Sequence, residues 1–131
     1  MSDVIPSKHE SILTKKCFGH VATIGPDGEP QSSPVWVDYD GTNLRISQNE
    51  QRQKLHNLRR NPEISISAID PDDPYHYVEI RGKVADIQPD EGYAFINALA
   101  NKYLGQDYPY LQPGEERVIV SIRPTHTTSQ G

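Results

Sequence analysis

The stretch from Phe18 to Asp38, FGHVATIGPDGEPQSSPVWVD, decides the fold class. Residues 18–24 form an apolar run typical of a strand, and Gln31 to Asp38 alternates, with Val35 and Val37 on one face and Trp36 on the other. Between these runs, Pro26-Asp27-Gly28-Glu29-Pro30 combines a proline that fixes φ with a glycine that tolerates positive φ. The stretch therefore predicts a β-hairpin.

The sequence on either side of this hairpin adds more strands and few helices. Asp40-Gly41 predicts a turn into a third consecutive antiparallel strand. The remaining strand signals are at Leu44–Ser47, Ile64–Ser67, Tyr77–Ile87 and Val118–Ile122, the last ended by Pro124, and helical patterns occur at 7–16, 50–61 and from about Asp90. Six short strands with three inserted helices predict a mostly β fold. They favour a small antiparallel barrel over a doubly wound sheet.

Length and composition predict one domain spanning residues 1–131, with a polar N-terminal segment 1–6 and a polar tail 125–131. Hydrophobic residues make up 34% of the chain, and no run approaches the roughly 20 apolar residues that a membrane span needs. The single cysteine, Cys17, cannot form an internal disulfide, which fits a reducing compartment. We therefore expect a cytoplasmic protein without a membrane partner, in which Cys17 is a small buried hydrophobe.

The segment Glu50–Asn61 is the best indication of a ligand. It holds four of the 13 lysines and arginines, although the chain has a formal net charge of -5. A short helix here places Arg52 and Lys54 beside the free N–H groups of its first turn, which suits an anion. The alternative is an ordinary basic helix face solvated by water. A nucleic-acid partner is disfavoured by the net acidity and by the absence of a longer basic stripe with aromatics.

Several other site classes lack their sequence signatures. The five histidines show no metal-ligand spacing, and neither a Gly-x-Gly-x-x-Gly nor a Gly-Lys-Ser/Thr motif is present. Gly105–Glu115, with two prolines and two glycines, predicts a long loop of the kind that often covers a site. Asp70–Tyr75 predicts a turn, or a loop that closes the substrate end. No catalytic residue is identified; Tyr75, His76, Tyr77 and solvent are the candidate proton donors.

A series of motifs carries a family resemblance. The first motifs resemble, in this order, those of the pyridoxamine-phosphate-oxidase-like split barrels: Ala22-Thr23-Ile24, Pro26–Pro30, Pro34-Val35-Trp36, Asp40-Gly41, Arg52-Gln53-Lys54 and Asn57–Pro62. Further motifs resemble the branch of that family that uses the deazaflavin coenzyme F420 and occurs mainly in actinobacteria: Asp70–Tyr75, Glu79–Gly82, Lys102–Gly105 and Pro113–Glu115. The resemblance runs in order over residues 10–125.

This resemblance implies a six-stranded antiparallel split β-barrel that forms a homodimer, with F420 in the groove between two barrels. It implies that Arg52, Lys54 and Asn57 hold the cofactor's phosphate and that the second-strand stretch flanks its ring, namely Gln31, Ser32, Ser33, Pro34 and Val35. Pro34 has no N–H, so a ring contact there uses its carbonyl or its ring surface. The implied activity is hydride transfer between F420 and a small electron-poor organic substrate. Two alternatives stay open: an FMN-binding relative, and a carrier that binds F420 or a flavin without turnover.

Overall fold

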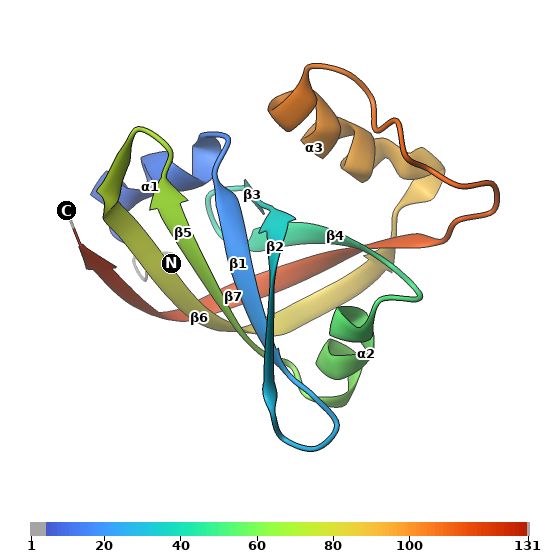
Figure 1. The fold of residues 1–131 in the computed structure, drawn as a ribbon, viewed down its shortest axis with the longest axis horizontal. Helices are drawn as coiled ribbons and strands as arrows, with labels where there is room; N and C mark the ends of the chain where they lie inside the picture. Colours follow the sequence, from blue (N-terminus) through green and yellow to red (C-terminus); the bar gives the residue numbers. More distant parts are fainter. Residues whose placement is uncertain (1–4, 131) are drawn as a thin grey trace.

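The structure is a computed structural model that describes residues 5–130, so residues 1–4 and 131 of the predicted terminal segments lie outside the described residues. The chain forms one curled antiparallel sheet with helices along its rims (Figure 1). The helices are α1 Ser7–Thr14, α2 Gln53–Arg60 and α3 Ala94–Leu104, and the 3₁₀ turn η1 Glu91–Tyr93 precedes α3. The strands are β1 Phe18–Ile24, β2 Pro30–Trp36, β3 Asp38–Tyr39, β4 Leu44–Asn49, β5 Glu63–Asp70, β6 Asp73–Pro89 and β7 Arg117–Gln130.

The predicted hairpin is confirmed, with β1 at the predicted bounds. β1 pairs with β2 from Phe18 opposite Trp36 to Ile24 opposite Pro30. The third strand does not continue this pairing, because the sheet order is β2-β1-β5-β6-β7-β4-β3. Curling of the sheet brings β2 back toward β4, where no ladder joins them. This gap is the split of a split barrel, so the predicted barrel type is confirmed.

Residues 5–130 form a sheet of seven strands, so the prediction of six is wrong. The predicted strand over residues 31–38 breaks at Val37, which separates β2 from the two-residue β3. The Val37 N–H donates to Tyr103 Oη at 3.0 Å, and its carbonyl accepts from Lys102 Nζ at 2.8 Å. The N–H and the carbonyl of Val37 are thus hydrogen-bonded to side chains of α3. In a continuous strand these two groups would pair with a neighbouring strand.

The last strand also differs from its prediction, because β7 continues through Pro124 to Gln130. Residues 126–130 of the predicted tail pair with β6 from Arg81 to Tyr77, and β6 itself begins earlier than predicted, at Asp73, which pairs with Asp70 of β5. The register shifts between Arg81 and Gly82, so Pro124 lies at a bulge, where a missing N–H disrupts the ladder least. A Cβ at Gly82 would lie 2.5 Å from the Arg123 carbonyl, so glycine permits this close approach of the strands.

The core lies inside the curl of the sheet. Alternate residues of the strands point inward, for example Val21 of β1 and Ile66 of β5, and both are fully buried. Helix α1 adds Ile12 and Leu13, and α2 adds Leu55. Cys17 belongs to the same core with 1% of its surface exposed, so the prediction of a small buried hydrophobe is confirmed. None of the helices in residues 5–130 is both long and apolar enough to cross a membrane.

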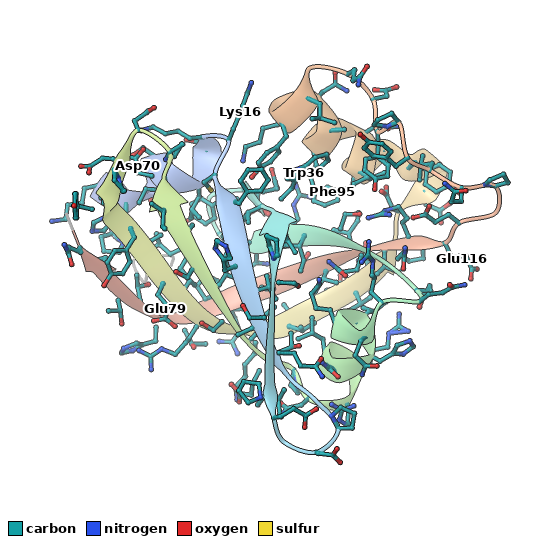
Figure 2. All side chains as sticks on the ribbon, viewed as in Figure 1. Lys16, Trp36, Asp70, Glu79, Phe95 and Glu116 are labelled. Carbon is teal, nitrogen blue, oxygen red and sulfur yellow. The ribbon has the colours of Figure 1, made fainter. Side chains whose placement is uncertain are left out.

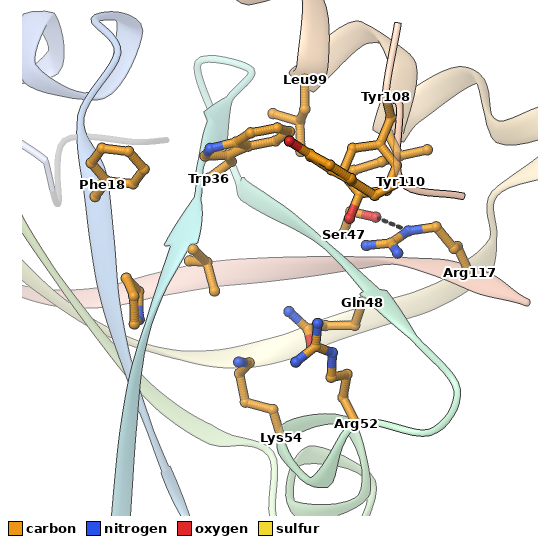
Figure 3. Close-up of a pocket in the computed structure, with 13 residues that line it drawn as sticks. Phe18, Trp36, Ser47, Gln48, Arg52, Lys54, Leu99, Tyr108, Tyr110 and Arg117 are labelled. Atoms are coloured by element: carbon orange, nitrogen blue, oxygen red, sulfur yellow. Dashed lines mark hydrogen bonds between the residues drawn. The ribbon is translucent and has the colours of Figure 1, made fainter. Parts of the chain in front are cut away.

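Helix α2 positions the basic segment at the open side of the barrel. Leu55 and Leu58 anchor its inner face. Arg59 and Arg60 lie in the last turn, where positive charges interact favourably with the helix dipole. Arg52 is the N-cap residue and Lys54 is in the first turn, so both precede the anchored part of the helix. The predicted helix is therefore confirmed with a shorter span, and its cationic start faces the split between β2 and β4 (Figure 3).

Candidate functional site

A pocket of about 350 Å³ lies in the split of the barrel, between β2 and β4 (Figure 3). Its floor comes from these two strands, α2 lies at one end, and α3 with the following loop lies at the other. A second hollow of about 220 Å³ adjoins it, and Arg52 and Lys54 line both. The two hollows form one groove with a cationic end and an aromatic end. The lining residues are Gln31, Ser32, Ser33, Arg52, Gln53 and Lys54 for the smaller hollow, and Phe18, Pro34, Val35, Trp36, Ser47, Gln48, Arg52, Lys54, Ile96, Leu99, Tyr108, Tyr110 and Arg117 for the larger.

The cationic end is built from Arg52 and Lys54. Lys54 Nζ donates to Ser33 Oγ at 2.6 Å, which ties the start of α2 to β2. Burial, together with the nearby charge of Arg52, lowers the pKa of Lys54. Within residues 5–130, neither cation forms an ion pair with a carboxylate, whereas Arg45 pairs with Asp38 and Arg59 with Glu50. Two adjacent cations without a counter-ion favour an anionic ligand at this end.

The structure brings seven of the eight predicted site residues to the groove. Arg52 and Lys54 face Gln31, Ser32 and Ser33 at the cationic end, and Pro34 and Val35 line the larger pocket.

Asn57 is the exception, because it is fully buried behind Gln31. Its Nδ2 donates to Thr23 Oγ1 at 2.9 Å and to Gln31 Oε1 at 2.8 Å, and its Oδ1 accepts from Gln53 and Arg60. In this arrangement both amide hydrogens of Asn57 are used within the protein. Its side chain therefore orients Gln31 and Gln53, which lie on the groove.

Gln48 is a candidate that the sequence prediction missed. It follows Leu44 and Ile46 on the inward face of β4 and is 5% exposed. Among residues 5–130 its Oε1 finds no hydrogen-bond partner, which is unusual for a buried amide oxygen. Figure 3 shows its side chain pointing toward those of Arg52 and Lys54. The sequence signal that could have identified Gln48 is its polarity, because the other inward-facing residues of this strand, Leu44 and Ile46, are apolar.

The other end of the pocket is aromatic. Trp36 stacks on Tyr103 with ring centres 5.1 Å apart and meets Tyr108 edge-on at 6.0 Å. Tyr108 in turn contacts Tyr110, which is 66% exposed at the pocket mouth. The predicted loop over residues 105–115 is confirmed, and it contributes both of these pocket tyrosines. The sequence marked the loop as a cover but not the rings that line the site.

Of the residues that the structure describes, Arg117 is the one with a charged side chain in the aromatic part of the pocket. It forms an ion pair with Glu115, its Nε donates to Ser47 Oγ at 3.0 Å, and its guanidinium lies 5.2 Å from the centre of the Tyr108 ring. The nearby carboxylate neutralises its charge. Arg117 therefore positions Tyr108 and Ser47 in this part of the wall.

The candidate proton donors lie elsewhere. Of the predicted turn Asp70–Tyr75, only Pro71 and Asp72 connect the strands, since β5 ends at Asp70 and β6 begins at Asp73. Asp70 lies at the opposite end of the sheet from Glu116 (Figure 2). His76 Nδ1 lies 3.0 Å from Asp70 Oδ2, and its Nε2 lies 3.0 Å from Nδ1 of the buried His9. Neither Tyr75, His76 nor Tyr77 lines the pocket of this chain.

The groove is suited to one kind of ligand. Its cationic end fits a phosphate, its middle offers a strand edge and the acceptor Gln48 Oε1, and its far end offers aromatic surfaces for a planar ring. A planar heterocycle that carries a phosphorylated side chain satisfies all three parts.

Comparisons with known proteins agree with this geometry. The family model for pyridoxamine 5'-phosphate oxidase matches residues 5–131. A solved structure named F420 reductase is 41% identical, with 95% of this chain and 98% of that chain covered and a TM-score of 0.88.

Two further solved structures extend the comparison. A conserved hypothetical protein from Mycobacterium tuberculosis is 25% identical, with 99% of this chain and 88% of that chain covered and a TM-score of 0.76. The General Stress Protein 26 from Bacillus anthracis is 20% identical, with coverages of 95% and 92% and a TM-score of 0.72, and shares the fold.

Proposed function

This chain belongs to the pyridoxamine 5'-phosphate oxidase family, and on that premise we propose that it is an F420-dependent oxidoreductase acting on a small electron-poor organic substrate. The observation that carries the proposal is the pair Arg52 and Lys54, which lacks a carboxylate partner in residues 5–130 and lies at one end of a groove sized for a cofactor. The likeness to a structure named F420 reductase supports the choice of the deazaflavin.

The phosphate of the cofactor is assigned to the cationic end. Arg52 offers a planar fork of donors and Lys54 a point charge, and Ser33 already contacts Lys54. Gln31, held by Asn57, adds an oriented amide from β2. These residues fix the position of the phosphate, and so the position of the ring attached to it.

The ring is assigned to the middle of the pocket. Pro34 and Val35 of the edge strand β2 line that part of the pocket and would flank the ring, and Gln48 Oε1 would accept a hydrogen bond from it. That bond gives the unpaired oxygen of Gln48 its missing partner, which is the test of fit that the structure offers. When bound, F420 supplies hydride chemistry at C5, while the chain orients the reactants and excludes water.

A second copy of the chain is proposed to complete the groove. Phe18 lines the pocket with 56% of its surface exposed, and Tyr110 is also exposed at the mouth. Exposed aromatic side chains at the edge of a site favour burial by a partner. We therefore assign the cofactor to the interface of a homodimer. Separately, the single cysteine supports our assignment of the protein to the cytoplasm.

FMN is the alternative cofactor, because family membership favours a flavin as much as a deazaflavin. Both cofactors carry a phosphate on a side chain attached to a planar three-ring system, so the same residues serve either. The choice is settled by parallel fluorescence titrations of the purified protein with F420 and with FMN. Tighter binding of FMN would reassign the protein to the flavin-dependent members.

The phosphate site is tested by the variants Arg52→Ala and Lys54→Ala, with Lys83→Ala as a control. Lys83 carries the same charge but pairs with Glu63 on the sheet, away from the groove. Losing one charge-assisted contact of about 1.5 to 3 kcal/mol weakens F420 binding roughly 10- to 150-fold. Titration curves for both site variants that match the control would refute the assignment.

Turnover separates an enzyme from a carrier. Protein loaded with reduced F420 is mixed with a panel of enones, quinones and tetrapyrroles, and oxidation of the cofactor is followed. An enzyme oxidises it faster than buffer with at least one acceptor. Tight binding with no acceleration by any member of the panel would favour a carrier.

A further inference from the structure

We propose that residues 94–116, which comprise α3 and the loop that follows it, form a hinged lid over the pocket, latched to the barrel by Lys102 and Tyr103. The lid segment supplies the aromatic end of the pocket through Ile96, Leu99, Tyr108 and Tyr110, while β2 and β4 supply the floor. The motion itself is a property of the free protein. That this motion opens the pocket and lets the cofactor leave rests on the proposed function.

The lid segment packs apart from the barrel core. The continuous core of the described residues runs from α1 through the strands to α2 and does not include α3. Helix α3 nevertheless buries four side chains of its own, Phe95, Ile96, Leu99 and Ala100. Moving the lid therefore uncovers this small cluster and leaves the barrel core intact.

The helix and the loop of the lid hold each other. Asn97 Oδ1 accepts from the Tyr108 N–H at 2.9 Å, and Asn101 Nδ2 donates to Asp107 Oδ1 at 2.8 Å. These bonds join two successive turns of α3 to the loop. The pocket tyrosines of the loop thus follow the helix as one body.

Left-handed backbone marks both ends of the lid segment. Gly92 and Tyr93 have φ values of 62° and 60°, and Gly114 has a φ of 75°. Tyr93 is the one non-glycine residue with positive φ in the described chain, and such conformations are often found at switch regions. Hinges absorb their rotation at a few residues of this kind.

The start of α3 is the fixed end. The Asp90 carboxylate accepts from the N–H groups of Phe95 at 2.8 Å and Ile96 at 2.9 Å, and is itself buried. Asp90 follows β6 directly, so this cap holds the helix start to the barrel. The free end of the helix, with Lys102 and Tyr103, then makes the larger movement.

The latch at that free end consists of polar bonds to backbone groups. Lys102 Nζ donates to the carbonyls of Leu13 at 2.9 Å and Val37 at 2.8 Å. Tyr103 Oη donates to the Cys17 carbonyl at 2.5 Å and accepts from the Val37 N–H at 3.0 Å. Water can replace each of these partners when the lid lifts, so the latch is reversible.

The chain carries its own reporter of this motion. Trp36 is the single tryptophan, it belongs to the barrel, and both of the rings it contacts here, Tyr103 and Tyr108, belong to the lid. Opening of the lid removes both rings from Trp36 and exposes it to water. Quenching of tryptophan fluorescence by acrylamide therefore measures the open population.

The test compares Tyr103→Phe with Tyr75→Phe in the full chain without ligand. Tyr103→Phe keeps the ring on Trp36 and removes only the hydroxyl of the latch, whereas Tyr75 is exposed near the start of β6. Loss of a hydrogen bond is expected to speed hydrogen exchange over residues 94–116 about fivefold in Tyr103→Phe, with β5 and β6 unchanged. Acrylamide quenching of Trp36 rises in parallel, and Tyr75→Phe matches the parent.

Two results would overturn the lid. One is unchanged exchange over residues 94–116 in both Tyr103→Phe and a second latch variant, Lys102→Met. The other is exchange that rises equally in all strands, which would mean global destabilisation. A titration with F420 tests the proposed function separately. Faster exchange in the latch variants without F420 binding supports the lid and rejects F420 as the cofactor. F420 binding with unchanged exchange supports the cofactor and rejects the lid.

Discussion

At the residue scale, Asn57 uses both amide hydrogens and its oxygen inside the protein. Its replacement by alanine leaves Thr23 and Gln31 without their buried partner, which is expected to lower the free energy of unfolding by about 2 to 3 kcal/mol. Urea denaturation measures this loss. Arg52→Ala, at an exposed position, is the control and should change stability by less than about 0.5 kcal/mol. A stable Asn57→Ala that still loses phosphate affinity would instead make Asn57 a direct ligand.

Gln48 is expected to behave in the opposite way. Gln48→Met keeps the volume and removes the unpaired buried oxygen, so the free protein should become more stable by about 1 kcal/mol. F420 binding should weaken about fivefold, because the ligand loses its acceptor. Thermal unfolding without ligand and a fluorescence titration measure the two effects. A loss of stability would show that Gln48 Oε1 is satisfied within the protein.

The residues of the site differ in how visible they are in the sequence. Arg52 and Lys54 stand out because a basic segment in an acidic chain is a local property of composition. The aromatic wall is not local, since Trp36 meets Tyr103 and Tyr108 only after α3 folds over the split. Asn57 lies at helical spacing from Lys54, but its amide donates to Thr23 of β1 and Gln31 of β2, which are distant in the sequence. Helical spacing placed Asn57 beside Lys54 and could not reveal that its side chain is already hydrogen-bonded within the protein.

At the element scale, α1 is held to the barrel by a pair of histidines. Burial, with smaller contributions from His76 and Lys8, lowers the pKa of His9 below its ordinary 6.5. The Asp72 N–H, Lys15 and His76 hold the pKa of Asp70 far below its usual range. The chain Asp70–His76–His9 therefore joins the β5–β6 turn to α1 in the state in which His9 is neutral.

The lowered pKa of His9 makes stability depend on pH. Unfolding restores the ordinary pKa of His9, so the unfolded chain binds more protons between that value and the lowered pKa. The free energy of unfolding should therefore fall as the pH is lowered from about 7 to 5. Urea denaturation across this range measures the slope. His9→Phe should flatten it and His20→Gln, on the exposed face of β1, should not; equal slopes for both variants would reject the assignment.

The elements show where sequence patterns suffice. The β1–β2 hairpin and α2 were predictable, because alternation, turn residues and helical spacing are all encoded within about ten residues. The continuation of β7 was not, since a proline normally ends a strand. Pro124 is accommodated by a bulge opposite Gly82, which lies more than 40 residues earlier in the chain. The division of β2 from β3 likewise depends on residues distant in the sequence. The side chains of Lys102 and Tyr103 form hydrogen bonds with the backbone of Val37 and interrupt the strand there.

At the scale of the whole molecule, the proposed homodimer has a direct test. Light scattering after size-exclusion chromatography should give twice the 14.7 kDa mass of the chain. Phe18→Asp places a charge at the exposed aromatic edge of the groove and should shift the protein to monomer and weaken F420 binding together. Lys83→Glu is the control for a change of charge elsewhere on the sheet. A monomeric parent that binds F420 tightly would show that one chain completes the site.

The burial of Cys17 has a practical consequence for work with this protein. The thiol is 1% exposed, burial raises its pKa, and the Tyr103 hydroxyl bonds to the backbone carbonyl of the same residue. Maleimide reagents attack accessible thiolates, so the folded chain should resist them. A cysteine introduced at an exposed position, such as Ser129, would then carry a dye or a surface attachment alone, and Cys17 would not have to be replaced first.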